Sequence, residues 1–204
     1  MSRHLFGDDV TFHQRLLKAQ GLYGGTLDGR WGSLTEAADR EFEQRGAQLA
    51  AAGMFDPRSE RLIAGLHLKA QAVARRLLSL ALGAGFRVCL ISGTRSYAEQ
   101  DQLHARGRYG NPGPRVTNAR GGQSNHNFGI AWDVGLFGTD GEYLNGDTAT
   151  EIAQYRRLGE LARPLGIEWG GDWKSLPDLP HYQVPTVSSV AETRRKFEAG
   201  EAYL

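Results

Sequence analysis

The stretch Arg120–Asp133 reads Arg-Gly-Gly-Gln-Ser-Asn-His-Asn-Phe-Gly-Ile-Ala-Trp-Asp, a glycine-rich loop that leads into a short strand. Successive side chains of a strand point to opposite faces, so Asp133 shares its face with an alanine and a glycine, both too small to fill the space in front of it. A carboxylate on an apolar strand is costly to bury unless its charge is offset. We therefore expect a metal ion at Asp133, with His126 at the end of the loop as a partner ligand.

Size and composition limit the possible classes of protein. The chain has 204 residues, enough for one domain and a small module, and its 40% hydrophobic and 23% charged residues are ordinary for a globular protein. A net charge of +1 gives no support to nucleic-acid binding, and no apolar run approaches the length of a membrane span. Residues 1–10 have no apolar core, so we expect no secretory signal. The single cysteine, Cys89, excludes an intramolecular disulfide.

Residues 1–50 predict a small helical module that precedes the main domain. Two helical segments flank the turn Gly24-Gly-Thr-Leu-Asp-Gly-Arg-Trp-Gly, in which Asp-Gly is a strong turn signal. This module resembles the three-helix peptidoglycan-binding module. The residues that fit its pattern are Tyr23, Gly25, Asp28, Gly29, Gly32 and Thr35. A helical hairpin that serves only as packing support is the alternative.

Residues 51–204 predict an α+β fold, in which helices flank a small antiparallel sheet. Apolar residues recur every three or four positions over residues 62–80 and predict one long amphipathic helix. Strands are expected over residues 86–91 and 130–137, and within the segments 167–173 and 178–184. Capping signals predict helices that begin after Ser96, Thr148 and Ser189. The long irregular segment 105–123 is interpreted as a substrate-facing loop.

Three side chains are candidate metal ligands: His126, Asp133 and His181. Two imidazoles and one carboxylate leave a tetrahedral Zn²⁺ ion with an open position for water, as in catalytic zinc sites. Such an ion acidifies the water and polarises a carbonyl group. Asp178, shortly before His181, is the expected base for this water. Arg95, which is always charged, is expected to stabilise the developing oxyanion.

These residues stand in the motifs Ser-Gly-x-Arg-Ser, Ser-x-His-x-x-Gly-x-Ala-x-Asp and Asp-x-Pro-His, in that order. The joint pattern resembles the zinc peptidases of bacterial cell walls: D-Ala-D-Ala carboxypeptidases and dipeptidases, and the L-Ala-D-Glu endopeptidases of phage endolysins. The resemblance covers residues 60–185. It implies that His126, Asp133 and His181 are zinc ligands, that Asp178 is the general base and that Arg95 polarises the substrate.

Within this family, the segments Val116–Gly129 and Trp169–Trp173 are closer to the endolysin-type endopeptidases. The resemblance implies hydrolysis of the L-Ala-D-Glu bond in peptidoglycan stem peptides, with carboxypeptidase or dipeptidase activity as the alternative. Gln123, Ser124 and Trp173 are expected to contact the peptide, or otherwise only to pack the loops. The chain is expected to act on the wall as a monomer, after release through a holin pore or delivery by a secretion apparatus.

Two other classes of protein use a similar ligand set. Two histidines and a carboxylate also form the iron site of non-haem oxygenases. Those sites usually place the first histidine and the carboxylate one residue apart, whereas six residues separate His126 from Asp133. The second alternative is a non-catalytic, zinc-stabilised protein that binds the wall. Asp178 and Arg95 argue against it, because a purely structural site needs neither a base nor an oxyanion partner.

Overall fold

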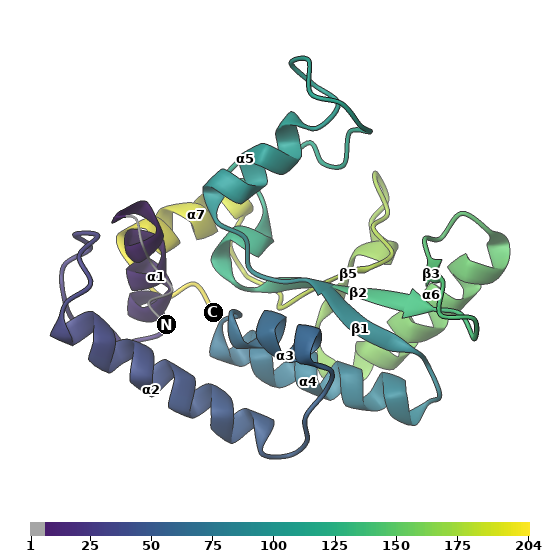
Figure 1. Ribbon diagram of the computed structural model, residues 1–204, viewed down its shortest axis with the longest axis horizontal. Helices are drawn as coiled ribbons and strands as arrows, with labels where there is room; N and C mark the ends of the chain where they lie inside the picture. The colour runs from purple at the N-terminus through teal and green to yellow at the C-terminus, as the bar shows by residue number, and fades with distance from the viewer. Residues whose placement is uncertain (1–6) are drawn as a thin grey trace. The chain divides into compact units, whose positions relative to one another are not determined.

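The computed structural model describes residues 7–204, which form two compact units (Figure 1). The first unit comprises the chain up to Arg45 together with Arg95–Gly129 and Thr186–Leu204, and the second comprises Gly46–Thr94 and Ile130–Pro185. One boundary falls near residue 50, but the N-terminal helices group with later segments. The independent module over residues 1–50 therefore stays a prediction. The expected absence of a secretory signal concerns residues 1–10, of which residues 1–6 lie outside the described part.

The second unit is built on an antiparallel sheet with the strand order β1-β2-β5-β4, and β3 pairs with β2. The strands are β1 (Val88–Ser92), β2 (Ala131–Phe137), β3 (Tyr143–Leu144), β4 (Glu168–Trp169) and β5 (His181–Gln183). Strand β2 pairs with three of the other four strands, so Asp133 lies in the middle of the sheet. This arrangement confirms the predicted α+β class with a small antiparallel sheet.

Helices cover one face of this sheet. They are α3 (Pro57–Ala64), α4 (Leu68–Gly83) and α6 (Ala149–Ala162), with single 3-10 turns at η2 (Arg163–Leu165) and η3 (Gly170–Asp172). Apolar side chains of α4 and α6 form one buried core with Trp132 and Val134 of β2 and Tyr182 of β5. Because strand side chains alternate, Asp133, His181 and Gln183 lie on the opposite face.

The predicted single helix over residues 62–80 is wrong, because the chain breaks between α3 and α4. Gly65 ends α3, and its N–H donates to the carbonyl of Ile63. His67 begins α4 as its N-cap, with ring Nδ1 accepting the N–H of Lys69 at 3.2 Å. Leu66 is fully buried within the break. The apolar spacing therefore continues through a loop, which periodicity cannot distinguish from a helix.

The first unit contains α1 (Gly7–Ala19), α2 (Ser33–Ala50, which continues past Arg45), α5 (Tyr97–Ala105), η1 (Asn125–Phe128) and α7 (Val190–Ala199). An aromatic cluster joins α1, α5, η1 and α7: Phe12 of α1 lies 5.2 Å from Phe197 and 6.2 Å from Tyr97, measured between ring centroids. Phe128 of η1 lies 5.5 Å from the same Phe197 ring. Among residues 7–204, no helix is apolar and long enough to cross a membrane.

Candidate metal centre

Asp133 and His181 are brought together by strand pairing. They lie directly opposite each other on the antiparallel strands β2 and β5, and Asp133 Oδ1 is 3.4 Å from His181 Nδ1. His181 is 5% exposed, so the pair is largely shielded from water. The space beside Asp133 is less open than its small neighbours suggested, because a Cβ added at Gly135 would lie 2.7 Å from a methyl group of Ile91.

His126 is held by the short 3-10 turn η1, which ends at Gly129 in the left-handed conformation with φ 69°. Glycine adopts that conformation without strain, so the chain can turn sharply from η1 into β2. The carbonyl of His126 accepts the backbone N–H of Arg95 at 3.0 Å. Asn127, fully buried, donates to the carbonyl of Arg95 at 2.9 Å and accepts the N–H of Gly122. These bonds fix the backbone of η1 to the Arg95 segment.

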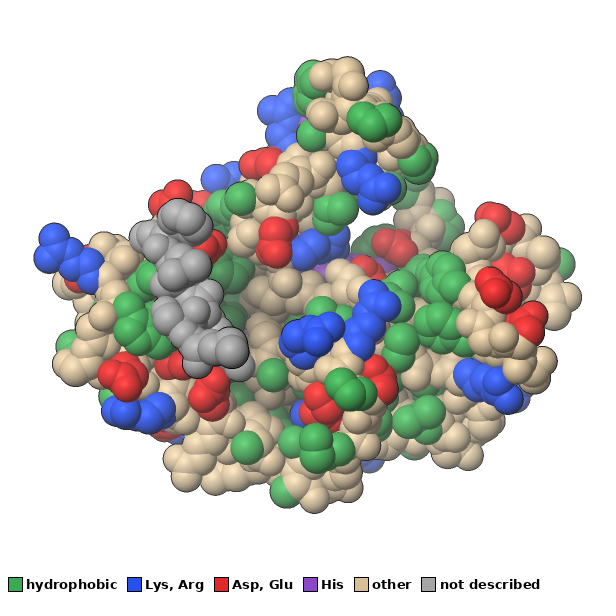
Figure 2. All heavy atoms as spheres, viewed as in Figure 1, with side chains coloured by type: hydrophobic (Ala, Val, Ile, Leu, Met, Phe, Trp, Pro, Cys, Tyr) green, Lys and Arg blue, Asp and Glu red, His purple; other side chains and the backbone are tan. Residues whose placement is uncertain are grey.

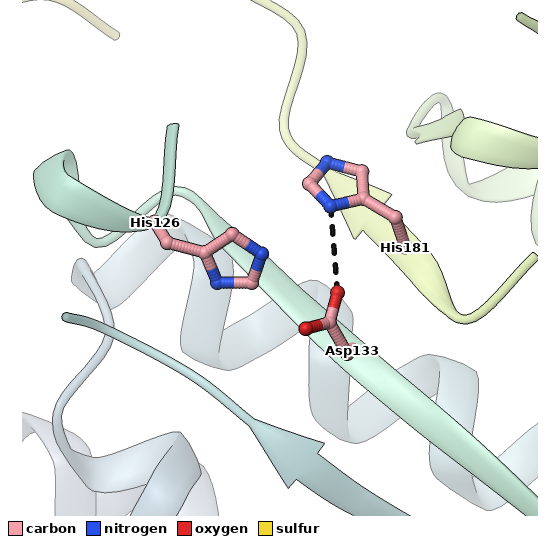
Figure 3. Close-up of side chains that lie close together, drawn as sticks. All are labelled: His126, Asp133 and His181. Atoms are coloured by element: carbon pink, nitrogen blue, oxygen red, sulfur yellow. Dashed lines mark ion pairs between the residues drawn. The ribbon is translucent and has the colours of Figure 1, made fainter. Parts of the chain in front are cut away.

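His126, Asp133 and His181 each offer one ligand atom, and these atoms lie within 4.8 Å of one another. Figure 3 shows both imidazoles directed toward the Asp133 carboxylate, with the Asp133–His181 pair marked. Ligand atoms about 2.0–2.1 Å from a tetrahedral zinc ion lie about 3.3–3.4 Å from each other. The measured 3.4 Å between Asp133 Oδ1 and His181 Nδ1 matches that separation. The donor set and the Asp133–His181 spacing therefore fit a zinc ion.

Electrostatics also favour a cation at this position. Burial lowers the pKa of His181, but the hydrogen bond and charge of Asp133, the hydrogen bond to Gln183 and the charge of Asp178 together raise it. The surroundings of His181 thus favour a positive charge. A bound dication would satisfy the same carboxylates while leaving the imidazole neutral, as metal ligation requires.

Asp178 is exposed, on the loop that leads into β5. The loop is held firmly: the Asp178 N–H donates to the carbonyl of Gly170 at 3.0 Å, and the His181 N–H donates to the carbonyl of Asp178 at 3.2 Å. The indole Nε1 of Trp169 donates to the carbonyl of Leu179 at 2.8 Å. The Asp178 charge contributes to the raised pKa of His181, which places it in the electrostatic surroundings of that imidazole.

The other expected site residues are placed as follows. Arg95 lies half-buried between β1 and the capping box of α5, in which Ser96 accepts the N–H of Glu99. Trp173 is 38% exposed, and its ring centroid lies 4.8 Å from that of His181. Gln123 is exposed and accepts the N–H of Arg120, and Ser124 stands at the N-cap of η1. Trp173 is thus set beside a candidate ligand, and peptide contacts of all three remain predictions.

The predicted irregular loop is also present, after α5, and it carries arginine side chains, drawn in blue in Figure 2. Arg108 holds the loop from within by donating to the carbonyls of His104 and Thr117. Arg106 and Arg115 are exposed. The loop is therefore braced by hydrogen bonds of Arg108 and carries exposed positive charge.

Two side chains that the sequence does not assign to the site support His181. Gln183 Oε1 lies 3.0 Å from His181 Nε2, and Gln183 Nε2 donates to Glu168 Oε2 at 2.6 Å. The position of Gln183 two residues after His181 on a strand places both on one face, and that signal was available. The sequence does not predict that Glu168 pairs with Gln183 across β4 and β5, because that pairing depends on the register of two separate strands.

Comparison with known proteins places the chain in a class. Residues 117–184, which include all three candidate ligands, match the family described as D-alanyl-D-alanine carboxypeptidase. The chain is 38% identical over 124 residues to the peptidoglycan L-alanyl-D-glutamate endopeptidase CwlK of Bacillus subtilis (strain 168), an alignment that covers 58% of this chain and 73% of CwlK.

Two solved structures are also similar. The L-Ala D-Glu endopeptidase ChiX of Serratia marcescens has 26% identity and a TM-score of 0.47, with 64% of this chain and 89% of ChiX covered. The vancomycin-resistance D,D-pentapeptidase VanY of a VanB-type cassette, in complex with Zn(II), has 18% identity and a TM-score of 0.41, with 67% of this chain and 80% of VanY covered.

The extent of the match to CwlK decides the class of protein. Because more than a third of the aligned residues are identical across nearly three quarters of that relative, the chain belongs to the M15 peptidase family. The predicted family is thereby confirmed.

Proposed function

We propose that this protein is a zinc-dependent peptidoglycan peptidase that hydrolyses the L-Ala-D-Glu bond of the stem peptide. One observation carries the proposal: the ligand atoms of His126, Asp133 and His181 converge in a chain that is 38% identical to an L-alanyl-D-glutamate endopeptidase. The sheet supplies two of these side chains, Asp133 and His181, from directly paired strands, which supports the proposal.

In this mechanism His126, Asp133 and His181 would hold the zinc ion. When bound there, it would supply Lewis acidity toward the scissile carbonyl group and the attacking water. Asp178 accepts a proton from the attacking water as the new C–O bond forms. It then passes that proton to the nitrogen of the leaving amine as the C–N bond breaks. The products are a carboxylate on L-Ala and a free amine on D-Glu.

Arg95 is proposed to stabilise the negative charge that develops on the carbonyl oxygen. Its backbone N–H is bonded to the carbonyl of His126, so its position depends on the same turn that carries a ligand. The ring of Trp173, beside His181, is proposed to be one wall for the bound peptide, and Gln123 and Ser124 are proposed to contact the same peptide.

The test is mass spectrometry of fragments released from purified peptidoglycan by the zinc-loaded protein. A new free amine on D-Glu is expected, and it requires the endopeptidase reaction. The matched variant Asp178→Asn should retain zinc and lose turnover by about 100-fold or more, because the base is removed while the ligands are unchanged. Parent-like hydrolysis by this variant would remove Asp178 from the mechanism.

A D,D-carboxypeptidase is the second candidate, because the matching family carries that description. Release of terminal D-Ala in the same experiment would favour it over the endopeptidase. No release of any fragment by the zinc-loaded chain would favour a non-catalytic wall-binding protein. We also propose that the protein reaches the wall through a phage holin pore or by a secretion apparatus.

A further inference from the structure

Four polar side chains form a continuous row across the face of the sheet opposite the helices. Asp133 on β2 faces His181 on β5, and Gln183 on β5 faces Glu168 on β4. His181 and Gln183 are two residues apart on one strand and therefore share a face. The successive distances are 3.4 Å (Asp133 Oδ1 to His181 Nδ1), 3.0 Å (His181 Nε2 to Gln183 Oε1) and 2.6 Å (Gln183 Nε2 to Glu168 Oε2).

The order of hydrogen-bond donors and acceptors in this row is set by Glu168, which lies at its outer end. An ionised Glu168 carboxylate only accepts hydrogen bonds, so the amide of Gln183 must turn its NH₂ group toward Glu168. The carbonyl oxygen of Gln183 then faces His181 Nε2 at 3.0 Å. An oxygen acceptor at that distance requires the proton to be on Nε2. In a neutral ring, the lone pair is then on Nδ1, the atom that faces Asp133.

We propose that Gln183 and Glu168 are positioning residues that fix His181 as its Nε2–H tautomer and so present Nδ1 to the metal ion. The identity of that ion as zinc rests on the proposed function, whereas the order of hydrogen bonds does not. Partners of this kind orient a ligating imidazole and raise its basicity, and their loss typically weakens metal binding by about 10–100-fold.

The burial of Gln183 and Glu168 determines how strongly each residue is expected to affect metal binding. Gln183 is 8% exposed and His181 is 5% exposed, so their hydrogen bond is sheltered from water. Glu168 stands at the exposed end of the row. Its negative charge polarises the Gln183 amide and makes the carbonyl oxygen a better acceptor for Nε2–H. Gln183 should therefore have the larger effect on metal binding, and Glu168 the smaller.

The first test identifies the coordinating nitrogen directly. Nitrogen-15 NMR of the full chain loaded with cadmium-113 should show coupling between the metal and Nδ1 of His181, with a slowly exchanging proton on Nε2. Coupling of cadmium to Nε2 would overturn the proposal. Because no substrate is present, this result is independent of whether the protein cleaves peptidoglycan.

The second test measures the zinc dissociation constant of variants. Gln183→Met keeps the volume and removes the acceptor, so it should raise the constant about 10–100-fold. Glu168→Gln should give a smaller rise, and the matched control Glu160→Gln, at an exposed carboxylate of α6 that pairs with Arg163, should give none. An unchanged constant in Gln183→Met would overturn the proposal.

A double substitution separates hydrogen bonding from packing. In Glu168→Gln/Gln183→Glu the carboxylate and the amide exchange places, so an acceptor again faces Nε2 and an amide NH₂ again faces the carboxylate. Zinc affinity should recover toward that of the parent, whereas a role limited to volume predicts no recovery. If Gln183→Met does not fold, the exposed Glu168→Gln and the double variant decide the matter. Parent-like zinc binding without wall cleavage would contradict only the proposed function.

Discussion

The loop that carries Asp178 depends on a single glycine. A Cβ added at Gly170 would lie 2.6 Å from the carbonyl oxygen of Asp178 and 2.9 Å from Cβ of His181, both of which are backbone or rigid atoms. The Gly170 carbonyl also accepts the N–H of Asp178. Gly170, the first glycine of the Trp-Gly-Gly-Asp-Trp segment, is therefore needed because two chain segments approach closely there, and not because of an unusual φ angle.

Gly170→Ala is expected to destabilise the protein by about 1–3 kcal/mol, as other overpacked sites do. Hydrolysis should fall by about 10-fold or more, since small displacements of positioned groups are costly. Thermal unfolding and fragment release measure the two effects. Gly83→Ala is the control, because nothing lies within 4 Å of its added Cβ. Equal behaviour of the two variants would show that the loop can yield at Gly170.

At the scale of elements, the break between α3 and α4 introduces a histidine as a helix cap. His67 Nδ1 accepts the N–H of Lys69, and the ring is 6% exposed. Burial, together with the charge of Lys69, lowers the pKa of His67 from 6.5 to about 4. The unfolded chain therefore takes up a proton at a higher pH than the folded chain does.

The sign of the pH dependence follows from this lowered pKa. The stabilisation is fully present above pH 6.5 and decreases as the pH falls from 6.5 toward 4, where the folded ring also becomes protonated. The expected loss is about 3 kcal/mol at most. Urea unfolding across this range measures it in the parent and in His67→Asn, which keeps a capping side chain but does not titrate. The same slope in both proteins would assign the pH dependence to other groups.

At the scale of the whole molecule, the N-terminal helices belong to a unit that also contains later segments. Phe12 of α1 packs against Phe197 of α7 and Tyr97 of α5, which lie far along the chain. Helix α7 in turn packs on η1 through Phe197 and Phe128. Removing the N-terminal helices would thus expose apolar rings in addition to removing any wall-binding surface.

Phe12→Ala is expected to lower the free energy of unfolding of the full chain by about 2 kcal/mol, since its half-buried ring contacts two others. Leu34→Ala, at a residue that is 66% exposed, should change it by less than about 0.5 kcal/mol. Denaturant unfolding monitored at several wavelengths measures both. If Phe12→Ala unfolds only residues 1–50 and leaves the remainder unchanged, those residues are an independent module as predicted.

The candidate site was predictable in part, for identifiable reasons. His126, Asp133 and His181 were recognised because their side chains are typical metal ligands and because the alternation along β2 set Asp133 among small neighbours. The same alternation did not show that the space beside Gly135 is occupied by Ile91, whose strand pairs with β2. The sequence does not indicate a role for Asn127. Its hydrogen bond to the carbonyl of Arg95 joins residues that are 32 positions apart, although its other partner, Gly122, is close in sequence.

The sequence by itself determined the features that depend on neighbours within a few residues. Ser96 and Glu99 form a capping box at the start of α5, as the local sequence predicts. Thr148 likewise caps α6, but the Glu151 side chain accepts the N–H groups of Gly146 and Asp147 instead of the N-cap N–H. Only the tertiary structure decided which strand residues face one another. The row from Asp133 to Glu168 depends on the registers of β2 with β5 and of β5 with β4. The residues between two strands do not determine which residues of those strands pair with each other.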